Sequence, residues 1–368
     1  MKWMKTMTIF MILSFFLSCA RSADKTVKPA DIVKVTTNPK EIYIEQGALG
    51  QYLNFDFVVE NLTGATLRVN KVVVSVYDNK ESLLLQKFLD SGSFSPSIWI
   101  IPEREVKPEQ SLLIFNPFQI FSSDVALSKL RYEFTFDPIG QGKQYKSEIV
   151  VNPVVFQPKT DLILPLKGRL LIFDGHDFYA HHRRLNYLHP MPRQIGLSSN
   201  FMRYGEDFSV ITEYGEKFRG DEEKLENWFA FGMPVYSTGD GKVAALSFDL
   251  PDSRAFNDAG FVNNPMIICG NYIVIDHLNG EFSIFCHLKQ GSTKVKLGET
   301  IKQDQPIAQV GSSGSAYFPH LHYELRTGTD LKVEGLPSYF RSFYRVLGAK
   351  KIEVNKGPVE TGEIVERK

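Results

Sequence analysis

From residue 33 onward the chain consists of short runs that are apolar or alternate between apolar and polar residues, and turn residues end each run. Such runs predict β-strands, because successive residues of a strand point to opposite faces of a sheet, whereas a helix repeats its apolar residues about every three or four positions. The runs form two blocks, one over residues 33–155 and one that begins at residue 228. No convincing amphipathic helix interrupts them. We therefore expect a mainly β protein.

The first block, residues 33–155, has short strand patterns at the spacing of an antiparallel β-sandwich and resembles an immunoglobulin-like module. It contains no cluster of histidines, cysteines or paired acids, and all eight histidines of the chain follow residue 168. We interpret this block as a spacer or binding module. Residues 156–348 then form the unit that carries chemistry, and the highly charged segment 349–368 is expected to be a frayed tail.

The charge balance excludes one class of partner. The chain has 368 residues, enough for two folded units, and its basic and acidic residues both total 42. A protein that binds nucleic acid neutralises phosphates with a surplus of basic residues. No such surplus exists here, so we expect no nucleic acid partner.

The N-terminus has the features of an export signal. A lysine-bearing start precedes the apolar run Met7–Leu17, which is shorter than the roughly 20 residues of a membrane span, and Ser18-Cys19-Ala20 follows. A small residue directly before a cysteine resembles the lipobox of bacterial lipoproteins. The resemblance implies a signal peptide over residues 1–19 that ends with a lipidated Cys19, and the polar residues 20–32 are expected to act as a tether.

The lipid anchor would place the mature chain in the cell envelope, outside the cytoplasm. Ala20-Arg21 brings no acidic residue after the cysteine, which favours the outer membrane, facing the periplasm, if the cell has two membranes. The alternative is an ordinary secreted protein in which Cys19 is incidental.

Two histidines separated by one leucine stand near the C-terminus, His320 and His322, after the loop GSSGSAYFP. On a strand, residues at i and i+2 point to the same face, so both imidazoles project together. Two imidazoles about 7 Å apart can serve one site. A pair of exposed surface histidines is the alternative.

A third histidine, His287, lies in a predicted hairpin. The hairpin signal is Asn279-Gly280, which favours a two-residue type I′ turn. That turn predicts four pairs of facing residues, namely His277 with Phe282, Ile275 with Ile284, Ile273 with Cys286, and Tyr272 with His287. His287 and His277 then lie on opposite faces of the hairpin, so only one of them can join a given site.

The same register bears on the cysteines. Besides Cys19 the chain has only Cys269 and Cys286. The register places Cys269 four positions beyond the partner of Cys286, roughly 13 Å away at about 3.3 Å per residue, which is beyond the reach of a disulfide. We expect two free, buried thiols.

Several short motifs occur in a fixed order along the second unit. They are FGMPV, GDGKV, GNYIVIDH, FCHL, VKLGETI, GSSG and PHLH. Together they resemble the lysostaphin-type zinc metalloendopeptidases, which cut peptide cross-bridges or stems of bacterial peptidoglycan, over about residues 165–330. The resemblance implies a β-rich lysostaphin-type peptidase domain after the sandwich, with peptidoglycan peptides as substrate.

The resemblance also implies a site. His322 would ligate zinc, Asp207 would supply the carboxylate ligand, and His287 and His320 would be the catalytic histidines. Zinc hydrolases keep three protein ligands and one position for water. One catalytic histidine would take a proton from that water and the other would donate a hydrogen bond to the oxyanion, without the sequence deciding which does which.

One motif departs from the family pattern. The usual H-x-x-x-D reads Arg203-Tyr204-Gly205-Glu206-Asp207, so the first zinc ligand is missing. Upstream, GHDFYAHHRR resembles the "G-H-R-R" element of a branch of the family that carries R-Y/F-A-x-D-F in place of the compact motif. Our hypothesis is that His182 supplies the missing ligand. The other candidates are His181, then His176 and His189, whereas His277 is expected to be structural.

The motifs therefore favour a lipid-anchored zinc endopeptidase of peptidoglycan. The alternative is a degenerate, non-catalytic peptidase-like lipoprotein that binds peptidoglycan or activates another cell-wall hydrolase as a protein partner. A metallopeptidase that acts on proteins would share every catalytic residue, so the sequence leaves it open.

Overall fold

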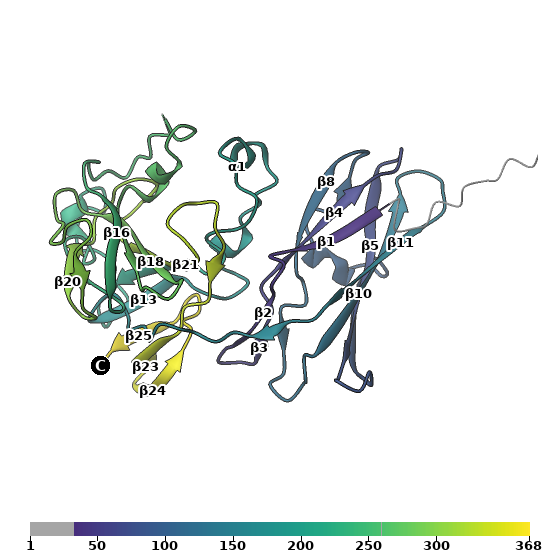
Figure 1. The fold of residues 1–368 in the computed structure, drawn as a ribbon, viewed down its shortest axis with the longest axis horizontal. Coiled ribbons are helices and arrows are strands. Elements are labelled where there is room, and N and C mark those ends of the chain that lie inside the picture. Colours follow the sequence, from purple (N-terminus) through teal and green to yellow (C-terminus); the bar gives the residue numbers. More distant parts are fainter. Residues whose placement is uncertain (1–32, 259) are drawn as a thin grey trace, which may run out of the picture.

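The computed structural model describes residues 33–258 and 260–368. The expected signal peptide, the lipidated Cys19 and the tether lie outside the described residues. Within the described part, no helix has both the length and the apolar character needed to cross a membrane. Two β-rich parts lie side by side, with the N-terminal part on the right and the C-terminal part on the left of Figure 1. The expectation of a mainly β protein is confirmed.

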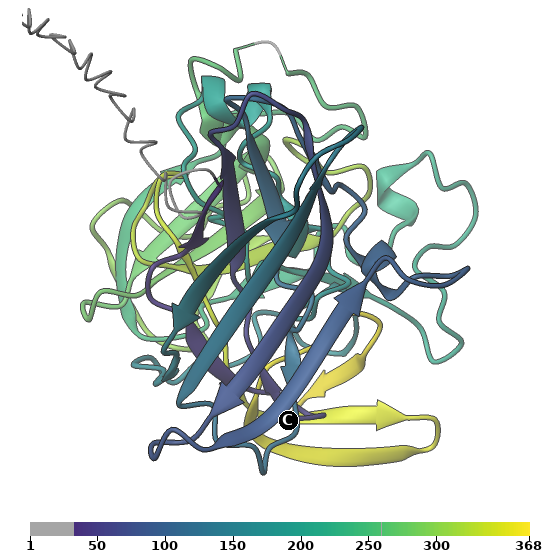
Figure 2. The same cartoon turned by 90° about the vertical axis from the view of Figure 1, so that its right-hand side faces the viewer.

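The N-terminal part is a sandwich of two sheets (Figure 2). One sheet has the order β1-β4-β8, and the other has the order β11-β10-β5-β6 with β7 beside β5. The strands are β1 (Val33–Asn38), β4 (Asp56–Asn61), β5 (Leu67–Tyr77), β6 (Leu83–Asp90), β7 (Glu105–Val106), β8 (Ser111–Phe115), β10 (Lys129–Pro138) and β11 (Tyr145–Val151). A short 3-10 helix, η2 (Ser97–Ile100), follows β6.

Alternation along the strands forms the core of the sandwich. Every second residue of β10, from Leu130 to Phe136, is buried, and these side chains face those of β4. The ring of Phe57 on β4 lies 4.9 Å from the ring of Tyr132 and 5.0 Å from that of Phe134. The expected β-sandwich is therefore present, and its likeness to an immunoglobulin module stays a prediction.

A third, small sheet lies where the two parts meet. It has the order β12-β2-β3-β9 and consists of β2 (Tyr43–Gln46), β3 (Gln51–Tyr52), β9 (Ile120–Phe121) and β12 (Val154–Val155). Strand β12 leads the chain from the sandwich into the C-terminal part, as Figure 1 shows.

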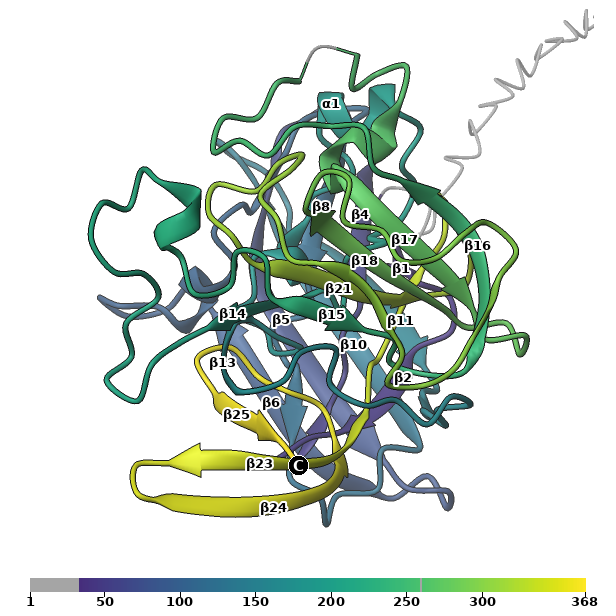
Figure 3. The same ribbon diagram turned by 90° about the vertical axis from the view of Figure 1, so that its left-hand side faces the viewer.

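The C-terminal part is organised around one sheet of 11 strands, with the order β19-β16-β17-β18-β21-β14-β13-β25-β23-β24 and β22 beside β21 (Figure 3). The strands are β13 (Arg169–Asp174), β14 (Glu206–Val210), β16 (Gly241–Ser247), β17 (Asn271–Asp276), β18 (Phe282–Leu288), β19 (Thr300–Ile301), β21 (Leu321–Arg326), β22 (Gly335–Leu336), β23 (Phe340–Leu347), β24 (Lys350–Gly357) and β25 (Ile364–Arg367). Strands β15 (Pro234–Tyr236) and β20 (Pro306–Gln309) pair separately. The helices are short, namely α1 (Pro190–Gln194), η3 (His182–Arg184), η4 (Leu225–Asn227) and η5 (Pro265–Cys269).

The expectation that residues 349–368 form a frayed tail is wrong. Strand β24 pairs with β23, and β25 lies between β13 and β23 in the main sheet. The side chain of Val365 is buried in the core, and Glu366 forms a cross-strand ion pair with Arg169 at 3.3 Å. The charges of this segment therefore belong to the exposed face of a paired strand, so the C-terminal unit extends past residue 348.

The expected register of the β17–β18 hairpin is wrong by one residue over Ile273–Asp276, whereas Asn271 pairs with Leu288 as that register requires. Ile273 pairs with Phe285 rather than with Cys286, and Ile275 pairs with Ser283 rather than with Ile284. The last pair is Asp276 with Phe282, so a longer connection replaces the two-residue turn. Leu278 adopts a left-handed φ of 61° inside that connection, which the Asn-Gly signal did not indicate.

The expectation of two free thiols is also wrong. Cys269 and Cys286 form a disulfide, with their Cα atoms 4.8 Å apart. Cys269 ends the 3-10 helix η5, and Gly270 with φ 68° turns the chain before β17 begins. Because Cys269 is not an extension of β17, counting strand positions overestimated its distance from Cys286.

Candidate metal centre

Strands β14 and β21 are neighbours and bring a carboxylate directly opposite an imidazole. Asp207 pairs with His322 in the antiparallel register, and Asp207 Oδ1 lies 2.9 Å from His322 Nδ1. Leu321 and Tyr323 point to the other face, into the core, because side chains alternate along β21. His320 Nε2 lies 3.5 Å from the same Asp207 oxygen. The H-x-H pair and Asp207 therefore converge on one site.

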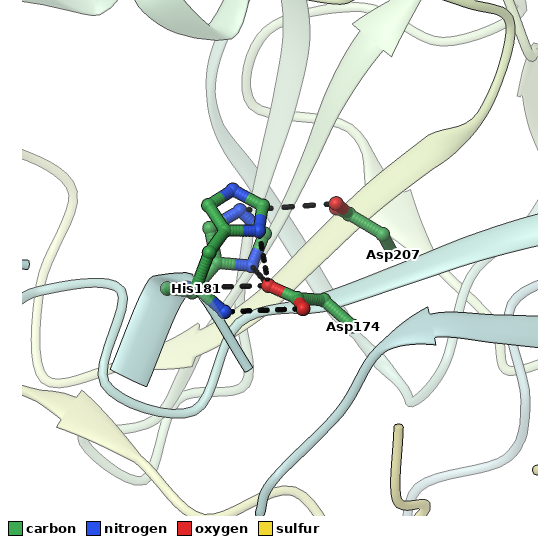
Figure 4. Close-up of side chains that lie close together, drawn as sticks. Asp174, His181 and Asp207 are labelled. Atoms are coloured by element: carbon green, nitrogen blue, oxygen red, sulfur yellow. Dashed lines mark hydrogen bonds and ion pairs between the residues drawn. The ribbon is translucent and has the colours of Figure 1, made fainter. Parts of the chain in front are cut away.

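His182 reaches this site from the short helix η3. Its Nε2 lies 3.8 Å from Asp207 Oδ2, and its ring centre is 4.5 Å from that of His322. His181 is oriented differently, since its side chain is 64% exposed and its Nδ1 lies 2.6 Å from Asp174 Oδ2. Asp174, His181, His182 and Asp207 each offer a ligand atom, and these atoms all lie within 4.8 Å of one another. Figure 4 shows the side chains of Asp174, His181 and Asp207 close together.

His287 completes the group of imidazoles. Its ring centre lies 4.8 Å from that of His320 and 5.8 Å from that of His322. The residue has a left-handed φ of 58°, a conformation that is costly for a residue with a Cβ and tends to occur at functional sites. The register of β17 and β18 shifts just there, between Asn271 and Ile273. Simple alternation, which placed Cys286 on the face away from His287, therefore does not apply, and both residues line the same cavity.

His287 and His320, which are not proposed ligands, each have one ring nitrogen held by a main-chain carbonyl. His287 Nδ1 lies 2.8 Å from the oxygen of Ser313, and His320 Nδ1 lies 2.8 Å from the oxygen of Phe318. If Nδ1–H donates to the carbonyl, Nε2 carries a lone pair that can accept a proton. Burial lowers the pKa of His287 well below its ordinary value and also lowers the pKa of His320, so both rings are neutral at neutral pH.

The carboxylates of Asp174 and Glu324 lie beside the proposed ligands His182 and His322. The sequence analysis identified neither carboxylate as part of the site. Asp174 accepts hydrogen bonds from the main-chain N–H groups of His181 and His182, at 3.1 and 3.2 Å, and its Oδ2 lies 3.0 Å from His182 Nδ1. Glu324 Oε1 lies 2.6 Å from His322 Nε2 and accepts a bond of 2.6 Å from Arg326. Such partners orient the imidazoles that ligate metals.

These supporting residues differ in how far the sequence signals them. Glu324 stands two positions after His322, so strand alternation alone places it on the same face. Asp174 has no local signal. It reaches the site because β13 pairs with β14, where Asp174 faces Asp207 across a register shift.

Comparison with known proteins identifies the domain. Residues 228–333 match Peptidase family M23. The chain carries an M23 peptidase domain. The resemblance to lysostaphin-type peptidases is thereby confirmed at the level of the family, and the matched segment contains His287, His320 and His322.

Two curated relatives and one solved structure illustrate the match. Cell division protein DipM of Caulobacter vibrioides is 28% identical over 129 residues, which are 35% of this chain and 18% of DipM. Peptidoglycan DD-endopeptidase ShyC of Vibrio cholerae is 36% identical over 93 residues, which are 25% of this chain and 17% of ShyC. The chain thus spans less than a fifth of either relative. The catalytic domain of lysostaphin from Staphylococcus simulans is 16% identical, with a TM-score of 0.25 over 46% of this chain and 88% of that one.

The donor set of the site, in which only His322 belongs to the matched segment, fits a zinc ion. A tetrahedral zinc site with metal–ligand distances of about 2.0–2.1 Å separates its donor atoms by roughly 3.3 Å. His182 Nε2 lies 3.8 Å from Asp207 Oδ2 and His322 Nδ1 lies 2.9 Å from Asp207 Oδ1, so each nitrogen is within about half an ångström of that separation from one of the two carboxylate oxygens. Two imidazole nitrogens and one carboxylate oxygen are also the ligand types that zinc hydrolases use.

The electrostatics of the M23 site favour a cation. Burial by itself raises the pKa of Asp207, but the surrounding histidines outweigh burial and hold that pKa well below its usual range. Burial lowers the pKa of His322, but hydrogen bonds to Asp207 and Glu324 raise it to about 9. In the metal-free protein His322 therefore carries a proton that a metal ion would replace.

A cavity of about 220 Å³ gives access to the M23 site. It is lined by His182, His287, His322 and the disulfide between Cys269 and Cys286, together with neighbouring side chains. The proposed ligands are thus buried but adjoin a space that part of a substrate can enter.

Three other histidines, His176, His189 and His277, lie outside the candidate metal centre. His277 Nδ1 lies 2.7 Å from the oxygen of Asp240, and its Nε2 lies 2.7 Å from Ser283 Oγ, which agrees with the structural role expected for it. His176 Nε2 accepts a bond of 3.0 Å from the main-chain N–H of Ser338. His189 is exposed at the start of α1.

Proposed function

We propose that the protein is a zinc-dependent endopeptidase that cleaves peptide bonds of bacterial peptidoglycan. The observation that carries the proposal is the convergence of His182, Asp207 and His322, from three segments distant in sequence, beside His287 and His320. The names of the relatives support the substrate, since ShyC is described as a peptidoglycan DD-endopeptidase.

Zinc bound to this site would act as a Lewis acid and lower the pKa of a water molecule to about 7. His287 and His320 present their Nε2 atoms for proton transfer, because their Nδ1 atoms are held by the carbonyls of Ser313 and Phe318. One of these imidazoles would accept a proton from the attacking water at Nε2, and the other would have to carry a proton on Nε2 in order to donate a hydrogen bond to the oxyanion. Glu324 would keep the ring of His322 oriented, and Asp174 would hold the main chain of His182.

The test uses the chain without residues 1–19, purified, freed of metal and then titrated with zinc. We expect one zinc ion per chain and release of peptides from purified peptidoglycan, identified by mass spectrometry. Asp207→Ala removes the central carboxylate and should abolish both. A protein substrate digested as rapidly as peptidoglycan would reassign the substrate class while leaving the zinc site in place.

A non-catalytic role is the second candidate, and one observation favours it. Arg203 stands where the family's first motif has histidine, and its guanidinium binds Asp56 and Glu334 instead of the proposed site. In that case the domain would bind peptidoglycan or activate another hydrolase. A wild-type chain that binds peptidoglycan but holds no zinc would support this candidate against the enzyme.

We also propose that the protein is anchored through a lipid on Cys19, outside the cytoplasm in the cell envelope. A tether would hold the peptidase near its substrate and raise the local concentration of cleavable bonds. Labelling cells with a radioactive fatty acid tests this, because label should enter the wild-type chain and not Cys19→Ala. Equal labelling of both would contradict the anchor.

A further inference from the structure

Two fully buried arginines of the C-terminal part bind one carboxylate of the sandwich. Asp56 lies at the start of β4, and its side chain and those of Arg183 and Arg203 are 0% exposed. Asp56 Oδ1 accepts a bond of 2.9 Å from Arg183 Nη1, and Asp56 Oδ2 accepts a bond of 2.9 Å from Arg203 Nη1. Asp56 thus joins two segments of the other part of the molecule.

The other nitrogens of both guanidinium groups also donate hydrogen bonds, and the acceptor of Arg203 Nη2 is the carbonyl of Asn38 at 3.4 Å. Arg183 donates to Asn54 Oδ1 at 3.0 Å and to the carbonyl of Phe55 at 2.8 Å, so three consecutive residues of the sandwich hold it. Arg203 donates to Glu334 at 2.7 Å. Because a guanidinium group has a rigid, planar set of donors, such contacts fix its position and orientation. A buried charge without these partners would be strongly unfavourable.

Both arginines belong to the segments that carry the proposed metal ligands. Arg183 directly follows His182 in η3, and Arg203 precedes Asp207 by four residues. Asn200 links the segments further, since its Nδ2 donates to the carbonyls of His182 and Arg183 at 2.9 and 3.1 Å.

The segment between Arg203 and Asp207 also packs against the imidazoles themselves. A Cβ atom on Gly205 would lie 3.1 Å from His322 Cε1 and 3.3 Å from His182 Nδ1. The main chain is therefore in close contact with both rings, and a shift of Arg203 would be passed on to the site.

We propose that Asp56 is a positioning residue of the metal centre, which holds His182 and Asp207 in register by binding Arg183 and Arg203 together. The sandwich is then a structural part of the peptidase site rather than only a spacer. This inference rests on the proposed function, and it gives Arg203 a role in place of the histidine that the family motif has there.

The experiment compares Asp56→Asn with Glu60→Gln in the chain without residues 1–19. Both changes remove one negative charge from β4, but Glu60 pairs with the exposed Lys34 at 3.2 Å and lies away from the arginines. Zinc affinity is measured by competition with a chelator, and the fold is checked by near-UV circular dichroism. Peptidoglycan digestion is followed at limiting and saturating zinc.

We expect Asp56→Asn to bind zinc about 10–100-fold more weakly, the range found when a residue that supports a metal ligand is lost. Saturating zinc should restore digestion by the folded variant, which a general loss of folding would not allow. Glu60→Gln should match the wild type. An unchanged zinc affinity in folded Asp56→Asn would overturn the proposal.

A second variant covers the case in which Asp56→Asn does not fold. Asn54→Ala removes one acceptor of Arg183 and leaves Asp56 in place, so zinc affinity should fall by about threefold or more. An affinity equal to that of the wild type would then overturn the proposal. A wild-type chain that binds no zinc would instead refute the proposed function, and amide hydrogen exchange at His181 and His182 would decide the role of Asp56. If exchange at His181 and His182 is equally slow in Asp56→Asn and Glu60→Gln, the result contradicts a positioning role for Asp56.

Discussion

Asp207 and His322 face each other across the adjacent strands β14 and β21, with Oδ1 and Nδ1 2.9 Å apart although the residues are 115 positions apart in the sequence. This pair is the centre of the site, because His182 and His320 both approach the Asp207 carboxylate. The consequences for neighbouring residues can be tested one at a time.

The adjacent residues His181 and His182 provide a matched pair. His182 lies against Asp207 and His322, whereas His181 is 64% exposed and paired with Asp174. We expect His182→Ala to weaken zinc binding by more than the roughly 100-fold that loss of a supporting residue can cost. His181→Ala should change zinc affinity by less than about tenfold. Chelator competition measures both, and the reverse order would identify His181 as the ligand.

Replacing Glu324 tests the support of His322. Glu324→Gln keeps the shape of the side chain but removes the charge that faces His322 Nε2 and the buried Arg326. We expect zinc affinity to fall by about 10–100-fold and the free energy of unfolding to fall by about 3 kcal/mol or more. The control is Glu366→Gln, which breaks an ion pair with Arg169 between β13 and β25, two and three strands along the sheet from β21. Equal zinc affinities in the two variants would argue against this role.

Glu45 makes the stability of the junction between the two parts depend on pH. Burial raises the pKa of Glu45 to about 8, against the lowering effect of hydrogen bonds from Tyr204 and Asn54. The folded chain therefore keeps a proton that the unfolded chain releases near pH 4.5, so this contribution to stability is complete below pH 4.5 and is lost as the pH rises through 8.

The test measures the free energy of unfolding between pH 6.5 and 8, since burial lowers the pKa of the nearby His176 to about 3 and keeps it neutral throughout this range. Glu45→Gln, which resembles the protonated side chain, should remove a decline of up to about 1.4 kcal/mol per pH unit. Parallel pH curves for wild type and variant would contradict the raised pKa of Glu45.

The disulfide between Cys269 and Cys286 should be detectable in solution. A chain that begins at residue 20 should show no free thiol until it is reduced, because the remaining two cysteines are bonded. The double variant Cys269→Ala with Cys286→Ala should lose about 3 kcal/mol of unfolding free energy, given the sequence separation of 17 residues. Thiol titration and chemical denaturation measure these effects. Two titratable thiols in the native chain would restore the expectation drawn from strand spacing.

The sequence alone determined the features that depend on local periodicity. Alternation predicted the strands of the sandwich and placed His320 and His322 on one face of β21, because the geometry of a strand repeats every second residue. The order of the M23 motifs indicated Asp207 as a candidate ligand without any knowledge of its distance from His322.

Only the tertiary structure decided which distant segments meet. The left-handed conformation of His287 and the register shift beside it moved this residue and Cys286 to one cavity, against simple alternation. Asp174 joined the site through sheet pairing, and Asp56 joined it through buried arginines that lie 127 and 147 residues away. Contacts of this kind follow from packing and from the need to pair buried charges, and no short sequence pattern records them.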